Sequence, residues 1–346
     1  MKLSGEIVPP LLAWYDANKR ILPWRDDPTP YRVWVSEIML QQTRVEAVRA
    51  YYERFMAELP TLESLAEVDD ERLMKLWEGL GYYSRARNLK KAARMLVEEF
   101  SGEFPRSREG LLKLPGIGEY TAGAVASIAI NLAEPAVDGN VLRVISRLTG
   151  SRADIAKPQT RDEVSAALRK IYPAGRCGDF TQALMELGAT VCLPNGEPLC
   201  LVCPWVELCT ARREGVTDEI PVKAPKKART VEEKTVILLR CGELAAFHRR
   251  PPHGLLAGMW ELPNAEGALT RDEASALAQQ WGVEPLDTKA SIDAVHIFTH
   301  REWHMRSFRI ECAEPGGDFR WLAKEAFERE IALPSAFRDF LASLWR

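Results

Sequence analysis

Four of the seven cysteines in this 346-residue chain lie close together, in the pattern Cys192-x7-Cys200-x2-Cys203-x5-Cys209. Thiolates grouped in this way bind a soft metal, either one tetrahedral zinc or an iron–sulfur cube. Zinc ribbons usually contain two Cys-x-x-Cys pairs and this pattern contains one, so the spacing favours the cube and leaves zinc open. The odd number of cysteines argues against a disulfide framework.

Two carboxylates occupy local environments that could give them different pKa values. Glu37 borders the core stripe of an apolar helical run, 33–40, so it lies either on the solvated face or in apolar surroundings that raise its pKa. Asp138 opens a helix in Val137-Asp138-Gly139-Asn140, where the helix N-terminus favours a low pKa, although this sequence is also a common turn. One protonated and one ionised carboxyl can together break a glycosidic bond.

A pair of glycines, Gly116 and Gly118, separates two helical stretches. Glycines at alternate positions permit positive φ and let a ligand approach the backbone, and the amides of the next helix can point at a phosphate. A bare Gly-x-Gly is more often a tight turn. The helix–hairpin–helix frame here favours binding to a phosphate backbone.

The chain is predicted to be helical from about residue 10 to residue 190. Val141, Val144, Ile145 and Leu148 recur at helical spacing, and Thr29-Pro30 has the form of a helix start. Gln41-Gln42 falls in a turn between two predicted helices.

After Cys209 the composition changes. Residues 213–233 are rich in charge and proline and are predicted to be a linker. Beyond the linker we expect strands at 234–241, 243–249, 295–300 and 304–311, a helix beginning at the capping box Thr270–Glu273, and a last helix near 334–345. The prediction is a multidomain chain, with an all-α domain at 1–212 and an α+β domain at 234–346.

Composition excludes several classes of protein. Lys and Arg number 46 against 49 Asp and Glu, so a nucleic-acid partner would need a local basic face. No apolar run approaches the ~20 residues that cross a bilayer, and no signal-peptide pattern is present. We expect a soluble cytoplasmic protein that does not bind membranes.

Several longer motifs run in order across most of residues 20–210: LPWR (22–25), VWVSEIMLQQTRV (33–45), LWEGLGYYSRARNL (76–89), LPGIGEYTAGAV (114–125), VDGNVLRV (137–144) and FTQALMELGATVC (180–192). With the cysteine pattern, they resemble the adenine-specific mismatch DNA glycosylases (the MutY type) of the endonuclease III-like helix–hairpin–helix superfamily. One departure is the loop between the first two cysteines, which has seven residues where the family usually has six.

The resemblance implies roles for the matching residues. Glu37 would protonate the flipped adenine, and Asp138 would stabilise the cationic sugar by covalent capture, with support from Tyr120 and Asn140. Tyr120 stands where bifunctional members carry a lysine nucleophile, which implies a monofunctional enzyme. The other implied sites are an adenine pocket of Trp24, Arg25 and Gln182; intercalating Gln42 and Tyr82; and one [4Fe-4S] cluster on Cys192, Cys200, Cys203 and Cys209. The residues themselves indicate phosphate contacts at Gly116 and Gly118 of the hairpin. Arg85 and Arg87 lie in the basic run 81–94, which has no acidic residue and is either a solvated helix face or a second DNA contact.

The C-terminal segment has its own resemblance. Residues 249–263 are similar to the entry of a Nudix fold, but 270–284 lack the R-E-x-x-E-E helix that holds divalent metal in Nudix enzymes. The fold is therefore expected to recognise rather than hydrolyse. In the family this domain reads 8-oxoguanine with a Phe-Ser-His loop, and Phe298-Thr299-His300 matches that loop.

The sequence thus predicts a monomeric base excision repair glycosylase of the bacterial nucleoid that removes adenine opposite 8-oxoguanine or guanine in double-stranded DNA. Two alternatives stay open: a related glycosylase for thymine or oxidised pyrimidines, and a catalytically silent iron–sulfur DNA-binding protein. A third, a nucleotide pyrophosphatase, is excluded. The Nudix-like tail and Tyr120 argue against the first, both carboxylates against the second, and the missing metal ligands against the third.

Overall fold

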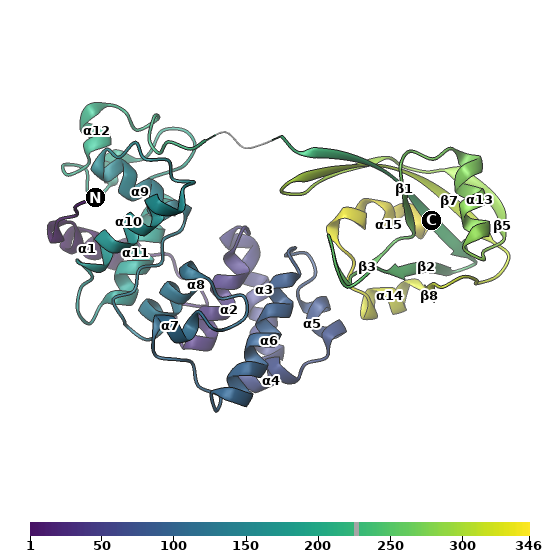
Figure 1. Cartoon of the computed structure of the whole chain (residues 1–346), viewed down its shortest axis with the longest axis horizontal. Helices are drawn as coiled ribbons and strands as arrows, with labels where there is room; N and C mark the ends of the chain where they lie inside the picture. Colours follow the sequence, from purple (N-terminus) through teal and green to yellow (C-terminus); the bar gives the residue numbers. More distant parts are fainter. Residues whose placement is uncertain (225–227) are drawn as a thin grey trace. The chain divides into compact units, whose positions relative to one another are not determined.

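The computed structural model describes residues 1–224 and 228–346 (Figure 1). The chain forms two compact units. The first contains Met1–Glu67 and the chain from Arg87 to residue 224, and the second contains Val68–Ala86 and the chain after residue 227. The prediction that 1–212 forms one domain therefore differs from the structure at Val68–Ala86.

The first unit is built from helices and short helical turns. They are η1 (Gly5–Ile7), α1 (Val8–Asn18), α2 (Pro30–Leu40), α3 (Val45–Glu58), α4 (Leu62–Glu67), most of α6 (Ser84–Glu99), α7 (Arg108–Leu111), α8 (Glu119–Ala124), the π-turn η2 (Val125–Ala129), α9 (Gly139–Thr149), α10 (Pro158–Arg169), α11 (Cys177–Thr190), η3 (Cys200–Val202) and α12 (Thr210–Glu214). The helix start predicted at Thr29-Pro30 is confirmed, because the Thr29 hydroxyl accepts a hydrogen bond from the Arg32 amide.

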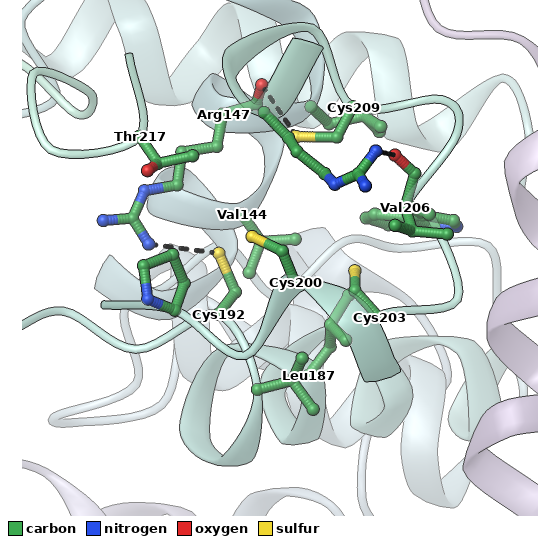
Figure 2. A pocket seen from close by; sticks show the side chains of 14 residues that line it. Val144, Arg147, Leu187, Cys192, Cys200, Cys203, Val206, Cys209 and Thr217 are labelled. Carbon is green, nitrogen blue, oxygen red and sulfur yellow. Dashed lines mark hydrogen bonds between the residues drawn. The ribbon is translucent and has the colours of Figure 1, made fainter. Parts of the chain in front are cut away.

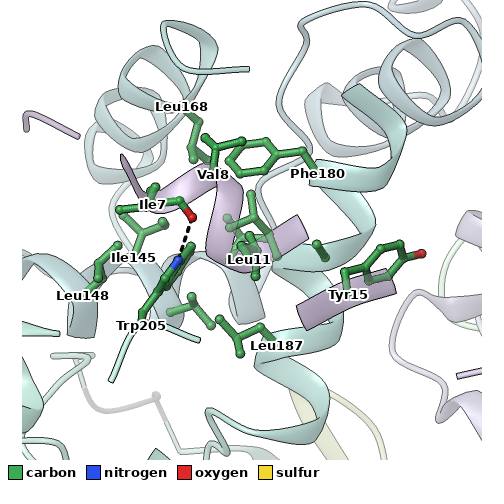
Figure 3. Close-up of a cluster of buried hydrophobic side chains, with 14 of the residues drawn as sticks. Ile7, Val8, Leu11, Tyr15, Ile145, Leu148, Leu168, Phe180, Leu187 and Trp205 are labelled. Atoms are coloured by element: carbon green, nitrogen blue, oxygen red, sulfur yellow. Dashed lines mark hydrogen bonds between the residues drawn. The ribbon is translucent and has the colours of Figure 1, made fainter. Parts of the chain in front are cut away.

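A buried apolar cluster joins α1, α9, α10 and α11 (Figure 3). Val141, Val144, Ile145 and Leu148 are all buried in it, which confirms their predicted stripe. The Trp205 indole N–H donates to the Ile7 carbonyl at 2.8 Å and fixes the chain after η3 against the N-terminus. Because each buried aliphatic side chain stabilises a fold by about 1.5–3 kcal/mol, this cluster holds α9 and α11 firmly beside each other.

The second unit contains a mixed sheet with the strand order β3-β2-β1-β7-β5. The central pair β1–β7 is parallel and the other pairings are antiparallel. Its strands are β1 (Thr230–Cys241), β2 (Leu244–Arg249), β3 (Trp260–Glu261), β4 (Asn264–Glu266), β5 (Pro285–Ala290), β6 (Ala294–Ile297), β7 (Arg301–Cys312) and β8 (Arg320–Leu322), and its helices are α5 (Asp70–Leu76), α13 (Arg271–Gln280), α14 (Lys324–Glu330), η4 (Ser335–Phe340) and α15 (Leu341–Leu344).

These strands and helices confirm the predicted α+β character. The capping box at Thr270 and Glu273 is present at the start of α13. Two strands are longer than predicted, because the parallel pairing of β1 with β7 begins at Thr230 and Arg301. The predicted last helix is a 3-10 segment, η4, followed by the short α15.

The predicted linker is too long at both ends. Its first residues end α12, and its last residues begin β1. Within it, Val222 accepts a hydrogen bond from the Ile155 amide at 3.0 Å and Ile220 accepts one from Arg147 at 2.7 Å. The part of the linker at 225–227 lies outside the described residues.

Specific bonds explain why Val68–Ala86 belongs to the second unit. The Lys75 ammonium donates to the Ile331 carbonyl at 2.8 Å, and the Glu78 carboxylate accepts the Leu333 amide at 2.9 Å. Both bonds lie at the end of α14 and join segments more than 250 residues apart. Separately, no helix among the described residues is long and apolar enough to cross a membrane.

Candidate active site

One cavity of about 680 Å³ in the first unit collects residues from four helical elements. Glu37 comes from α2, Tyr120 from α8, Asp138 and Asn140 from the start of α9, and Gln182 from α11. The volume is in the range of ligand pockets.

Glu37 is buried although it is a carboxylate, with 5% of its surface exposed. Burial raises its pKa to about 7, an increase that the nearby Asp138 assists and that Tyr120 and Arg25 oppose. The Tyr120 hydroxyl donates a hydrogen bond to Glu37 Oε2. The alternative in which Glu37 lies on a solvated helix face is therefore wrong, and the side chain can hold a proton near neutral pH.

Asp138 is the N-cap of α9, as its sequence predicts. Its carboxylate accepts the Val141 amide at 2.7 Å and the Asn140 side-chain amide at 2.9 Å. The expectation of a low pKa is wrong, because burial raises the pKa of Asp138 while these hydrogen bonds and Arg143 only oppose the increase. The Asp138 carboxylate still accepts more hydrogen bonds than the Glu37 carboxylate does. Among the described contacts, Glu37 is bonded only to Tyr120.

Asn140 is held in turn by Arg143. The Arg143 guanidinium donates to Asn140 Oδ1 at 2.8 Å, to the Gly188 carbonyl at 2.7 Å and to the Cys192 carbonyl at 2.8 Å. Gly188 leaves space for this arrangement, because a Cβ there would lie 2.7 Å from the Asn140 Cβ. Cys192 and Asp138 are thus connected through the side chains of Arg143 and Asn140.

The predicted adenine-pocket residues also line the cavity. Trp24 is buried and packs edge-on against Tyr52, with ring centroids 5.5 Å apart. Arg25 and Gln182 are half-buried. Sequence reasoning missed Glu186, a buried carboxylate in the same wall, whose only signal was a charge inside the apolar run of α11.

The residues predicted to face DNA in the turns and the hairpin are all exposed. Gln42 is exposed in the turn between α2 and α3 at φ 59°, and Tyr82 is 47% exposed at φ 46°. Gly116 has φ 77° in the hairpin, and a Cβ there would lie 2.6 Å from the Asn88 Cβ. Gly118 is the N-cap of α8, with open space where a Cβ would be.

Arg85 has a local structural role in addition to its predicted DNA contact. Its guanidinium donates to the carbonyls of Leu80 and Gly81 at 2.9 and 3.1 Å and lies over the ring of Tyr82. Burial lowers the pKa of Arg85 to about 10. Arg87, two residues further along the same helix, is half-buried.

The loop 298–300 joins β6 to β7 in the second unit. Phe298 is half-buried against Trp303, with ring centroids 4.8 Å apart, whereas Thr299 and His300 are exposed. The Thr299 hydroxyl lies 2.6 Å from the Tyr82 hydroxyl, within hydrogen-bonding distance. Two residues predicted to contact the lesion therefore meet within one compact unit.

The four clustered cysteines lie around one apolar pocket (Figure 2). The Arg147 guanidinium donates to the Cys192 sulfur at 3.3 Å and to the Leu193 carbonyl at 2.8 Å. Within residues 1–224 and 228–346, no three His, Cys, Asp or Glu side chains converge on a point that would hold a single ion. Four thiols that line one apolar pocket are the donor set that an iron–sulfur cluster takes.

Comparison with known proteins gives two domain matches. Residues 35–174 match the HhH-GPD superfamily of base excision DNA repair proteins, and residues 235–343 match the NUDIX domain. Proteins named adenine DNA glycosylase from Rattus norvegicus and Homo sapiens are both 36% identical to this chain over 95% of its length, covering 76% and 73% of theirs.

Solved structures agree with the first match. A thermostable thymine-DNA glycosylase is similar with a TM-score of 0.56 and 29% identity, over 60% of this chain and 96% of that one. Endonuclease III in a non-covalent DNA complex is similar with a TM-score of 0.52 and 27% identity, over 62% and 98%.

Proposed function

Because this chain belongs to the adenine DNA glycosylases, we propose that it removes adenine from mispairs with 8-oxoguanine or guanine in double-stranded DNA, as a monofunctional hydrolase. The observation that carries the proposal is the cavity in which Glu37, Tyr120 and Asp138 come together. A base inside a duplex cannot reach these groups, so the adenine must be flipped out of the stack.

Glu37 supplies the proton in this mechanism. A carboxyl with a pKa of about 7 is protonated in part of the molecules at neutral pH and can donate to a ring nitrogen of adenine. The protonated base leaves as the C1′–N9 bond breaks, and positive charge develops on the sugar. Tyr120, bonded to Glu37, orients the carboxyl toward the cavity.

Asp138 stabilises the cationic sugar. Its carboxylate is fixed by the Val141 amide and by Asn140, so it does not reorganise as charge develops. Water then adds to C1′. The net reaction is hydrolysis of the N-glycosidic bond, with the proton from water replacing the one that Glu37 gave.

A strand-cleaving step is not proposed, because the hairpin carries Tyr120 where a lysine amine would be needed to form a Schiff base. The Tyr120 pKa lies well above 10, raised first by burial, so the phenol stays neutral.

Recognition of the opposite base is assigned to Gln42, Tyr82 and the loop 298–300. Exposure of Gln42, Tyr82, Thr299 and His300 supports this assignment. We also propose that Cys192, Cys200, Cys203 and Cys209 hold one [4Fe-4S] cluster, which would cross-link the end of α11 to η3 and α12, and that the protein acts as a monomer.

The test is release of free adenine from four duplexes under single turnover: A opposite 8-oxoguanine, G, C or T. Thymine opposite G is a fifth substrate, which distinguishes a thymine glycosylase. Fast release from the first two duplexes and little from the others is expected. Equal release of adenine opposite T, or preferred release of thymine, contradicts the proposal. Replacement of Thr299 and His300 by alanine should reduce the preference for 8-oxoguanine over G without abolishing release.

A further inference from the structure

A third buried carboxylate, Glu186, lies in the wall of the adenine cavity and has no part in the mechanism above. It is 1% exposed and lies on α11, one turn after Gln182. Burial alone would raise its pKa, but hydrogen bonds from Arg20 and Arg25 lower it below the ordinary range. Glu186 is therefore a buried negative charge at neutral pH.

Two arginines converge on this charge. Arg20 donates to Glu186 through its Nε at 2.6 Å, its Nη2 at 3.0 Å and its backbone amide at 3.1 Å. Arg25 donates through Nη2 at 2.8 Å to Glu186 Oε2, the oxygen that also accepts the bond from Arg20 Nη2. Removing one partner of a buried ion pair destabilises the folded protein, because the other charge is left uncompensated.

Arg25 is the member of this cluster that also acts on the catalytic acid. Its positive charge opposes the increase in the Glu37 pKa. Its other bonds are few: Nη1 donates to the Arg20 carbonyl at 3.0 Å, and Nε is buried with no partner among the described residues. The ring of Tyr15 lies 5.7 Å from the guanidinium. Glu186 is the one anion bonded to Arg25 among the described contacts.

We propose that Glu186 is a positioning residue for base excision: it holds Arg25 against the cavity wall and prevents it from pairing with Glu37, so that Glu37 stays a proton donor. Without this anion, the Arg25 guanidinium has an alternative carboxylate in the same cavity. An ion pair between Arg25 and Glu37 would keep Glu37 ionised.

The other groups around Glu37 do not replace this function. Tyr120 on α8 donates a hydrogen bond to it, and Asp138 at the start of α9 repels its ionised form. Helix α2 also packs on α3 and η2, and no titratable side chain from those two elements acts on Glu37 in the described part of the chain. Among the described residues, Arg25 is the one cation whose charge acts on Glu37.

The direct test is Glu186→Gln, which keeps the shape of the side chain and removes its charge. Glu37 must be protonated to act, so release of adenine falls as pH rises through its pKa. In the variant this decline should begin about one pH unit lower, because a newly available cation favours the ionised acid by an amount of that order. Single-turnover release should then be about tenfold slower than wild type at pH 8 and only about twofold slower at pH 6, with unchanged duplex affinity.

Two further variants separate positioning from loss of structure. In a Glu37→Gln background, Glu186→Gln should have almost no further effect, because its route through Glu37 is gone. Glu163→Gln, an exposed glutamate on α10, is the matched control and should leave the pH profile unchanged. Equal slowing of Glu186→Gln at all pH values, or the same slowing in the Glu37→Gln background, overturns the proposal.

This inference rests on the proposed excision of adenine, and the same assay tells the two apart. If wild type releases no adenine, the function itself is wrong. If wild type releases adenine and the Glu186→Gln variant shows the same pH profile as wild type, only the proposed role of Glu186 is wrong.

Discussion

Replacing Glu37 by glutamine gives the sharpest test of the active site, because it affects stability and catalysis in opposite directions. The folded protein keeps the Glu37 proton up to about pH 7, whereas an unfolded chain loses it near the ordinary value of 4.5. Between these values the folded state binds more protons, so stability falls as pH rises through this window.

The size of the effect follows from the two pKa values. A difference between 4.5 and about 7 corresponds to about 3 kcal/mol, at 1.36 kcal/mol for each unit. Glutamine keeps the size of the side chain and never ionises. The Glu37→Gln variant should therefore be more stable than wild type by up to about 3 kcal/mol at pH 8, and by much less at pH 5.

Thermal unfolding followed by calorimetry measures this gap. For a unit of this size, 3 kcal/mol corresponds to a rise in Tm of roughly 6–12 °C. Adenine release by the same variant should fall on the order of 10²–10⁴-fold, the usual contribution of a general acid. Glu53→Gln, on the exposed face of α3, is the control for both measurements. A Tm gap that is the same at pH 5 and pH 8 would refute the reasoning that burial keeps Glu37 protonated.

Three further predictions concern the surroundings of this acid. Gly188→Ala places a Cβ 2.7 Å from the Asn140 Cβ, so Asn140 should lose its hydrogen bond to Asp138. Single-turnover excision should then slow at least about tenfold. The control is Gly5→Ala, which has open space around its new Cβ and should not change the rate. Borohydride treatment during turnover should trap almost no covalent enzyme–DNA adduct, since Tyr120 replaces the lysine, and efficient trapping would contradict a monofunctional enzyme. Cys209→Ser should reduce iron content and visible absorbance together, whereas Cys177→Ser, outside the cluster, should leave both unchanged; a protein that holds zinc instead would show neither absorbance nor iron.

The sequence predicted the local features well. The helix starts at Thr29 and Thr270, the apolar stripe of α9 and the hairpin before α8 all depend on residues a few positions apart. Such patterns are set by backbone propensity, capping and periodicity, which can be read without knowing the fold. The ends of β1 and β7 were predicted less accurately, because parallel pairing between distant segments extended both strands.

The electrostatics of the site could not be predicted in the same way. The sequence left Glu37 between a solvated and a buried setting and gave Asp138 too low a pKa. It also gave no reason to select Glu186, whose partners Arg20 and Arg25 lie more than 150 residues away. The grouping of Val68–Ala86 with the second unit was missed because it depends on bonds to the end of α14.

By itself, the sequence selected the residues that we propose for the chemistry of this protein: the two carboxylates, the tyrosine in place of a lysine, and the four cysteines. The tertiary structure decided the state in which those residues work. A pKa depends on burial and on charges that the fold brings within reach, and at Glu37 those neighbours come from α8, from the start of α9 and from the segment before α2. No window of adjacent residues contains them, so only the folded chain could show that burial raises the pKa of Glu37 to about 7.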